Sequence, residues 1–187
     1  MGDLLTFAPG QVRTLGPRPG SRCGLRRGTS ATRWYELGCR LEASEPARAI
    51  AAYERAVAGC PGFADAHNNL GRLLHDAGSL GAAESSYRLA ICADPGIALY
   101  WFNLGVAVED QGRRAEAIAA YERAIEISER SEAAGGGDPA GVADAHYNLA
   151  RLLELTGRRT GDELMLRRAV RHLLRYRELT RRNARAH

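Results

Sequence analysis

Three asparagines, each placed immediately before a leucine, are the residues best suited to bind another polypeptide. They are Asn69, Asn103 and Asn148. A side-chain amide has one acceptor oxygen and two N–H donors, so it can hydrogen-bond to the backbone of an extended peptide in both directions. On helices that stack side by side the three amides would form a column. We predict that this column holds a peptide.

The residues beside the asparagines complete the predicted site. Large side chains near the column would form pockets, and two arginines would anchor a ligand carboxylate. Acidic residues share the same surface and favour a mixed or basic ligand, although each charge taken alone is more typical of a solvated helix face. These acids are Asp65, Asp76, Glu109, Asp110, Asp144 and Glu154. The predicted peptide-binding residues are Asn69, Asn103, Asn148, Arg72, Arg151, Tyr35, Asn68, Phe102, Tyr147 and Asp76.

No residue pattern in the sequence supports catalysis, a metal site or a bound cofactor. The 26 basic residues are all arginine, which excludes a phosphate loop that depends on lysine. The motifs G-x-S-x-G, H-E-x-x-H and C-x-x-C are absent. The run from Gly135 to Ala140 formally fits G-x-G-x-x-A, but Pro139 would break the helix that should follow it. We therefore predict that the protein is not an enzyme.

A repeat of 34 residues must position the predicted site. Tyr53, Tyr87 and Tyr121 are 34 apart, and so are Ala49, Ala83 and Ala117. Each unit contains two helical patterns separated by a turn, which in the second unit are Ala64–Ala77 and Leu80–Ala93. A single helical hairpin cannot bury both of its faces, so neighbouring units must stack. The expected fold is all-α, a right-handed α-α superhelix with a concave inner wall.

Several repeat positions carry a family resemblance. The pattern W-x-x-L-G occurs at Trp34, Leu37 and Gly38 and again at Trp101, Leu104 and Gly105, followed in the second unit by Ala83, Tyr87, Ala90 and Pro95. These residues resemble the tetratricopeptide repeat (TPR) family, of bacterial type, over about residues 31–180. In that family an asparagine column holds peptide backbone, so the resemblance implies the same role here. It also implies a non-catalytic adaptor that binds a partner peptide or helix in a concave groove.

The repeats divide the chain into three predicted regions. Residues 1–30 have no period and are predicted to be a disordered basic arm. Residues 31–157 form the TPR array, with repeats near 31–63, 64–97 and 98–131 and a fourth that begins at 143. Residues 158–187 form the divergent second half of the fourth repeat and an Arg-rich capping helix. A glycine-rich loop is expected over Ser131–Pro139, and the last helix is expected to begin at Leu164.

Charge supports a second interpretation of the function. Both ends of the chain are basic, and the segment from Arg167 to Arg185 contains eight arginines and one glutamate. This segment could be a cap that solubilises the open end of the solenoid. It could also be a patch through which a regulatory protein associates with nucleic acid or an anionic surface. Tyr176 is its only aromatic residue, which argues against stacking on nucleic-acid bases.

Cysteine usage predicts the compartment. The four cysteines are Cys23, Cys39, Cys60 and Cys92, and no two of them form a C-x-x-C pair. A chain this long can bury its own core without a disulfide framework. We therefore expect free thiols in a reducing, cytoplasmic environment, with a protein or peptide as partner and no membrane association.

Overall fold

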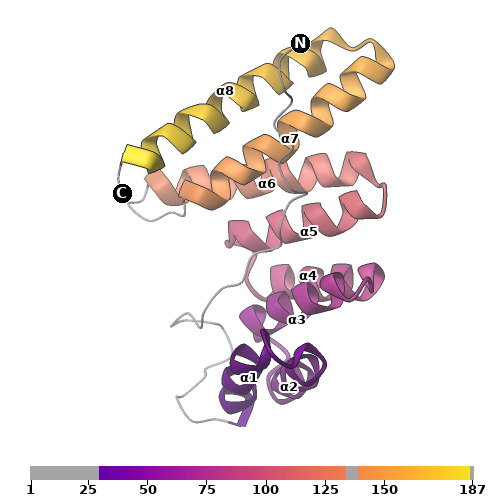
Figure 1. Cartoon of the computed structure of the whole chain (residues 1–187), viewed down its shortest axis with the longest axis vertical. Helices are drawn as coiled ribbons and strands as arrows, with labels where there is room; N and C mark the ends of the chain where they lie inside the picture. The colour runs from indigo at the N-terminus through magenta and orange to yellow at the C-terminus, as the bar shows by residue number, and fades with distance from the viewer. Residues whose placement is uncertain (1–29, 134–138, 186–187) are drawn as a thin grey trace.

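The structure, a computed structural model, describes residues 30–133 and 139–185, and these residues form eight helices in four antiparallel pairs. The pairs stack along one axis, from α1 and α2 at one end to α7 and α8 at the other (Figure 1). The predicted all-α superhelix is confirmed. The helices are α1 (Ser30–Leu41), α2 (Pro46–Gly59), α3 (Ala64–Asp76), α4 (Leu80–Ala93), α5 (Ala98–Asp110), α6 (Arg114–Ala133), α7 (Pro139–Thr160) and α8 (Glu163–Arg185).

The first helix of each pair lies on the inner side of the stack. Each pair packs internally, and its second helix packs against the first helix of the next pair. In addition, α3 contacts α5 and α5 contacts α7. Direct contact between the first helices places them along one continuous surface. We call the side of α1, α3, α5 and α7 that carries the predicted site the inner wall.

Within each of the first three pairs, a tyrosine ring packs on a glycine of the facing helix. A Cβ atom added to Gly38 would lie 2.6 Å from Cε1 of Tyr53, and one added to Gly105 would lie 2.6 Å from Cε1 of Tyr121. The same contact at Gly71 would measure 2.8 Å. All three tyrosines are fully buried. The ring therefore occupies the space that a side chain on the glycine would need, which explains why both residues recur with the repeat.

Three equivalent glycines turn the chain between the helices of a pair. Gly78, Gly112 and Gly161 have φ values of +77°, +77° and +72°, a conformation that other residues rarely adopt. The backbone N–H of Gly78 donates to His75 O, and that of Gly112 donates to Glu109 O. Both bonds satisfy carbonyl groups left open at the end of the helix.

The fourth pair differs from the expected helix boundaries. The structure has α6 continuing to Ala133 and α7 beginning at Pro139, so part of the expected loop is helical. Proline suits the first turn of a helix because its missing N–H would be unpaired there. Likewise α7 continues to Thr160, and α8 begins at Glu163, one residue before the expected Leu164. The predicted arm covers residues 1–30. Residues 1–29 lie outside the described residues, and Ser30 is the first residue of α1.

The cysteines depart from the expectation at one position. Cys39 and Cys92 are free thiols, as predicted. Cys60 is disulfide-bonded, so the prediction of a free thiol is wrong there. Cys60 is also buried in the core of the first two pairs, where it packs among apolar side chains.

Candidate peptide-binding surface

The structure places the three predicted asparagines on neighbouring helices of the inner wall. Asn69 lies in α3, Asn103 in α5 and Asn148 in α7, and all three are buried. The Nδ2 group of Asn69 donates to the hydroxyls of Tyr35 and Tyr53, at 3.3 and 3.4 Å. These hydrogen bonds tie α3 to both helices of the first pair. The role of the column in ligand binding remains a prediction.

Among the other predicted residues, some support the column and others reach the surface. Asn68 accepts a 2.8 Å hydrogen bond from Nδ2 of Asn103, which links α3 to α5. Asn68 is buried, as are Tyr35 and Phe102, and Tyr147 is half-buried against Tyr176 of α8. The charged members are more accessible, with exposed side-chain fractions of 13% for Arg72, 45% for Arg151 and 56% for Asp76.

Two equivalent Tyr–Glu–Arg clusters join successive repeats on the inner wall. In the first, Glu42 accepts a hydrogen bond from the Tyr53 hydroxyl and lies 2.7 Å from Nη2 of Arg72 in the next pair. In the second, Glu109 accepts a 3.0 Å hydrogen bond from the Tyr121 hydroxyl and pairs with Arg151. Burial, with the nearby glutamate, raises the pKa of both tyrosines. Both hydroxyls therefore remain protonated donors.

The interval between the two clusters is built differently. His75 occupies the position equivalent to Glu42 and Glu109, and Nε2 of His75 lies 2.8 Å from Asp110. Val106 occupies the position equivalent to Arg72 and Arg151. The junction between the second and third pairs thus lacks both the carboxylate and the arginine of the clusters, and a His–Asp contact joins α3 to α5 in their place.

Carboxylates dominate the accessible part of the inner wall. Asp76, Asp110 and Glu154 have exposed side-chain fractions of 56%, 45% and 49%. We call these three residues the acidic rim. Each of the three has a basic neighbour, because Asp76 pairs with Arg72, Asp110 lies 2.8 Å from His75 and Glu154 pairs with Arg158.

The sequence interpretation missed the glutamates that orient the arginines. Glu42 and Glu109 each follow the leucine of their repeat by five residues, and each pairs with an arginine two residues after the next repeat's leucine. This fixed offset was the available signal. It becomes informative only once the repeats are known to stack, because the paired residues are far apart along the chain.

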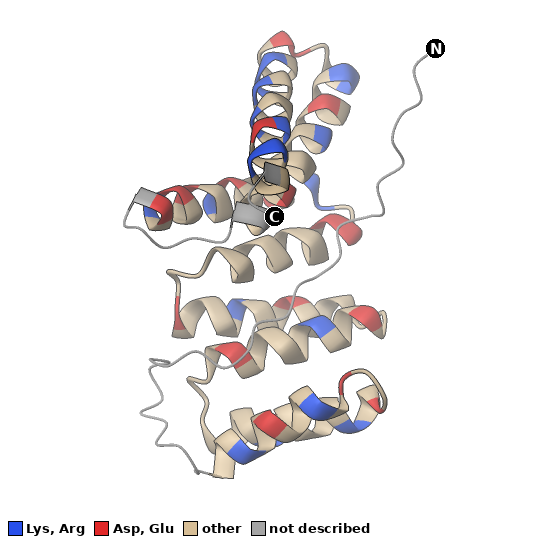
Figure 2. Cartoon of the chain, turned by 60° about the vertical axis from the view of Figure 1, so that its left-hand side comes forward, with Lys and Arg blue, Asp and Glu red and all other residues tan. Residues whose placement is uncertain are grey.

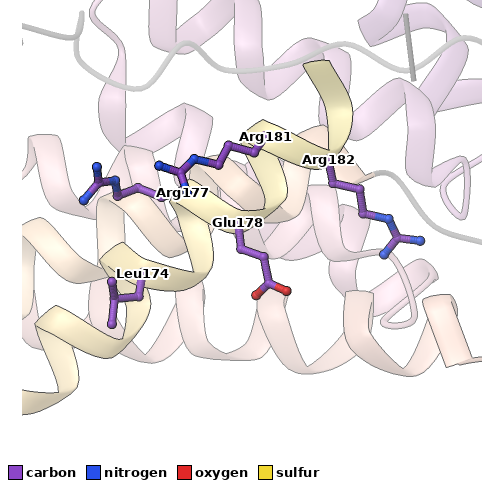
Figure 3. Close-up of a pocket in the computed structure, with 5 residues that line it drawn as sticks. All are labelled: Leu174, Arg177, Glu178, Arg181 and Arg182. Atoms are coloured by element: carbon purple, nitrogen blue, oxygen red, sulfur yellow. The ribbon is translucent and has the colours of Figure 1, made fainter. Parts of the chain in front are cut away.

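The last helix presents a separate basic surface (Figure 2). Arg168 of α8 pairs with Glu122 of α6. A hollow of about 520 Å³ is lined by Leu174, Arg177, Glu178, Arg181 and Arg182, all on α8 (Figure 3). Glu178, the one carboxylate of this lining, lies 2.8 Å from Nη1 of Arg175. Over residues 30–133 and 139–185, no helix has the length and apolar character needed to cross a bilayer.

The comparisons with known proteins agree with this architecture. Two tetratricopeptide repeat models match residues 40–98 and 98–131. The crystal structure of MamA is similar, with a TM-score of 0.69 and 21% identity, over 85% of this chain and 83% of that chain. MamA from Desulfovibrio magneticus RS-1 (residues 41 to the end) has a TM-score of 0.63 and 18% identity, over 81% and 76%.

A third structure was solved with a ligand. The first TPR of Spaghetti (RPAP3), bound to the HSP90 peptide SRMEEVD, has a TM-score of 0.59 and 18% identity, over 68% of this chain and 94% of that chain. At these identities the similarity shows a common fold. The comparison with curated proteins gives no match.

Proposed function

We propose that this chain, which belongs to the tetratricopeptide repeat family, is a non-catalytic adaptor that binds a peptide segment or helix of a partner protein along its inner wall. The observation that carries the proposal is the continuous wall formed by α3, α5 and α7, on which charged side chains are held in place by partners from neighbouring repeats. A structurally similar protein bound to a peptide supports the same role.

The exposure of each predicted side chain indicates whether it would contact the ligand directly. Arg72, Arg151, Asp76 and Tyr147 reach the accessible surface and would touch the ligand directly. Asn69, Asn103 and Asn148, together with Tyr35, Asn68 and Phe102, would form the polar and aromatic base beneath them. Because carboxylates outnumber free cations on the rim, we propose a partner segment of basic or mixed charge.

Charge reversal on the acidic rim tests this proposal. Asp76→Arg combined with Asp110→Arg places two positive charges where a basic segment would bind, on side chains exposed enough to leave the core intact. We expect peptides selected by the wild-type protein from a random displayed library to bind this variant at least tenfold more weakly, by calorimetry at low salt. The wild-type affinity should also fall as salt is added.

A matched control separates the rim from total charge. Glu54→Arg combined with Glu163→Arg makes the same change of charge at exposed positions on α2 and α8. We expect this control to bind the selected peptides within about twofold of wild type. Equal binding by the rim variant and the wild type would rule out the inner wall as the binding surface.

The surface of α8 supports a second candidate function, association with nucleic acid or another anionic surface. The supporting observation is the hollow lined by Arg177, Arg181 and Arg182, beside the exposed apolar side chains of Leu173 and Leu174. If this candidate is correct, the protein binds double-stranded DNA at low salt, and binding weakens steeply as salt rises. Replacing the three arginines by glutamine should then abolish the fluorescence anisotropy change of labelled DNA. A wild-type protein that gives no such change excludes this function.

A further inference from the structure

Tyr53, Tyr87 and Tyr121 occupy equivalent positions in successive repeats, but the Tyr87 hydroxyl has no hydrogen-bond partner among the described residues. The hydroxyls of Tyr53 and Tyr121 donate to Glu42 and Glu109. Tyr87 is their equivalent in α4, is fully buried, and has no hydrogen bond from its Oη atom to any described residue. The reason lies in the sequence, because His75 stands where the other two repeats have the glutamate.

Arg72, which also lies in the second repeat, has donor atoms without a hydrogen bond. The Nη1 atom of Arg72 donates to Asp76 at 3.1 Å, and its Nη2 atom lies 2.7 Å from Glu42 as an ion pair, but the buried Nε and Nη2 atoms have no hydrogen bond to any described residue. Burial raises the pKa of Tyr87, and Asp76 adds to this while Arg72 opposes it, so both charged groups act at the hydroxyl. The hydroxyl is therefore a protonated donor at neutral pH. Three buried donor atoms, Tyr87 Oη and Nε and Nη2 of Arg72, thus have no hydrogen bond to any described residue, and the Tyr87 ring packs on Gly71, the residue next to Arg72.

The surrounding charges restrict what can bind there. His75 is already 2.8 Å from Asp110 and 4.0 Å from Asp76, so its ring faces two carboxylates. Val106, a buried apolar residue, stands in α5 at the position where α3 and α7 have an arginine. A ligand carboxylate would be repelled by Asp76 and Asp110, whereas a neutral carbonyl oxygen would accept from the donors without that repulsion. Asp76 forms an exposed pair with Arg72, so moving its side chain aside has little energetic cost.

We propose that the Tyr87 hydroxyl and the Arg72 Nε atom form a subsite for a neutral hydrogen-bond acceptor, an amide carbonyl of the bound polypeptide. This inference rests on the proposed function, because it assigns one position within the same peptide-binding surface. It predicts that the middle repeat fixes the register of the ligand. The flanking repeats have already satisfied their equivalent tyrosines internally.

Paired tyrosine variants test the subsite. Tyr87→Phe removes a hydroxyl that has no described partner in the free protein, whereas Tyr121→Phe removes one that donates to Glu109. We expect Tyr87→Phe to melt at or above the wild-type temperature and Tyr121→Phe to melt below it. With peptides selected on the wild type from the random library, Tyr87→Phe should lower affinity about five- to tenfold, a change typical of one lost hydrogen bond. Tyr121→Phe serves as the control for folding only, because its partner Glu109 also pairs with Arg151, a proposed ligand contact.

The outcomes separate the subsite from the surface that contains it. If Tyr87→Phe binds the peptides as tightly as wild type while the rim reversal still weakens binding, the subsite is refuted and the proposed function stands. If neither variant weakens binding, both are refuted. If the loss in Tyr87→Phe disappears once aspartate and glutamate are removed from the peptide, the acceptor is a carboxylate, and the assignment to a neutral carbonyl is overturned.

Discussion

Gly105→Ala is expected to lower the free energy of unfolding by about 1–3 kcal/mol, the usual cost of overpacking a core. The new methyl group would lie 2.6 Å from Cε1 and 2.8 Å from Cδ1 of Tyr121. The tyrosine cannot easily move, because its ring packs against Phe102, with centroids 5.7 Å apart, and its hydroxyl donates to Glu109. Denaturant titration followed by helical circular dichroism would measure the change.

A second glycine provides the control for this substitution. Gly81 lies in the first turn of α4, and a Cβ atom added there meets nothing within 4 Å. Gly81→Ala should therefore leave stability unchanged or raise it by up to about 1 kcal/mol, through the lower entropy of the unfolded chain. Gly38→Ala and Gly71→Ala should behave like Gly105→Ala. Equal stabilities for Gly105→Ala and Gly81→Ala would contradict the proposed packing of ring on glycine.

The glycine and tyrosine positions also show why the fold could be predicted from the sequence. Tyr53, Tyr87 and Tyr121 recur at a constant spacing because each fills the same space opposite a glycine. A repeated packing contact leaves a repeated pattern in the sequence, and stacking follows because one hairpin leaves a face uncovered. The tetratricopeptide family and the all-α superhelix were therefore predicted correctly.

Helix boundaries in the fourth pair were less accessible to sequence reasoning. Pro139 and the glycines before it favour a loop when considered locally, yet the structure begins α7 at that proline. Proline both interrupts a helix and begins one, and only the packing of the following residues decides between these roles. The disulfide of Cys60 was missed for a related reason, since spacing along the chain does not show which thiols approach each other in space.

The candidate site was predictable only in part, because its geometry depends on contacts between repeats. The sequence identified Arg72 and Arg151 as cations on the inner wall, and both lie there. Their glutamate partners come from the preceding repeat, so the Tyr–Glu–Arg clusters appear only in the stacked structure. The same is true of Tyr87, whose unpaired hydroxyl is recognised by comparison with its two equivalents.

Acidification from about pH 6.5 to pH 4 is expected to destabilise the last pair of helices through a buried histidine contact. Nδ1 of His146 in α7 lies 2.9 Å from Nδ1 of His172 in α8. His146 is 3% exposed. Burial, followed by the neighbouring His172 and Arg175, lowers its pKa from 6.5 to about 4. The pKa of His172 is also lowered, by burial and Arg168, while Glu122 of α6 opposes that change.

The sign of this effect follows from the protons that each state binds. Between pH 6.5 and pH 4 the unfolded chain protonates His146, whereas the folded protein keeps it neutral. Stability is therefore complete above pH 6.5 and falls as the pH decreases toward 4. The shift corresponds to a loss of about 3.5 kcal/mol, because each pKa unit represents about 1.4 kcal/mol. His67, whose pKa is also lowered by burial, adds a loss of the same sign.

Comparison of variants isolates the contribution of the histidine pair. His146→Gln retains a side chain that can hydrogen-bond to His172 but cannot gain a charge in this pH range. Its free energy of unfolding, measured in denaturant at several pH values, should therefore fall less than that of wild type between pH 6.5 and pH 4. An unchanged slope in His146→Gln would show that the contact between α7 and α8 does not depend on a neutral His146, since removal of its titration would then have no effect on folding.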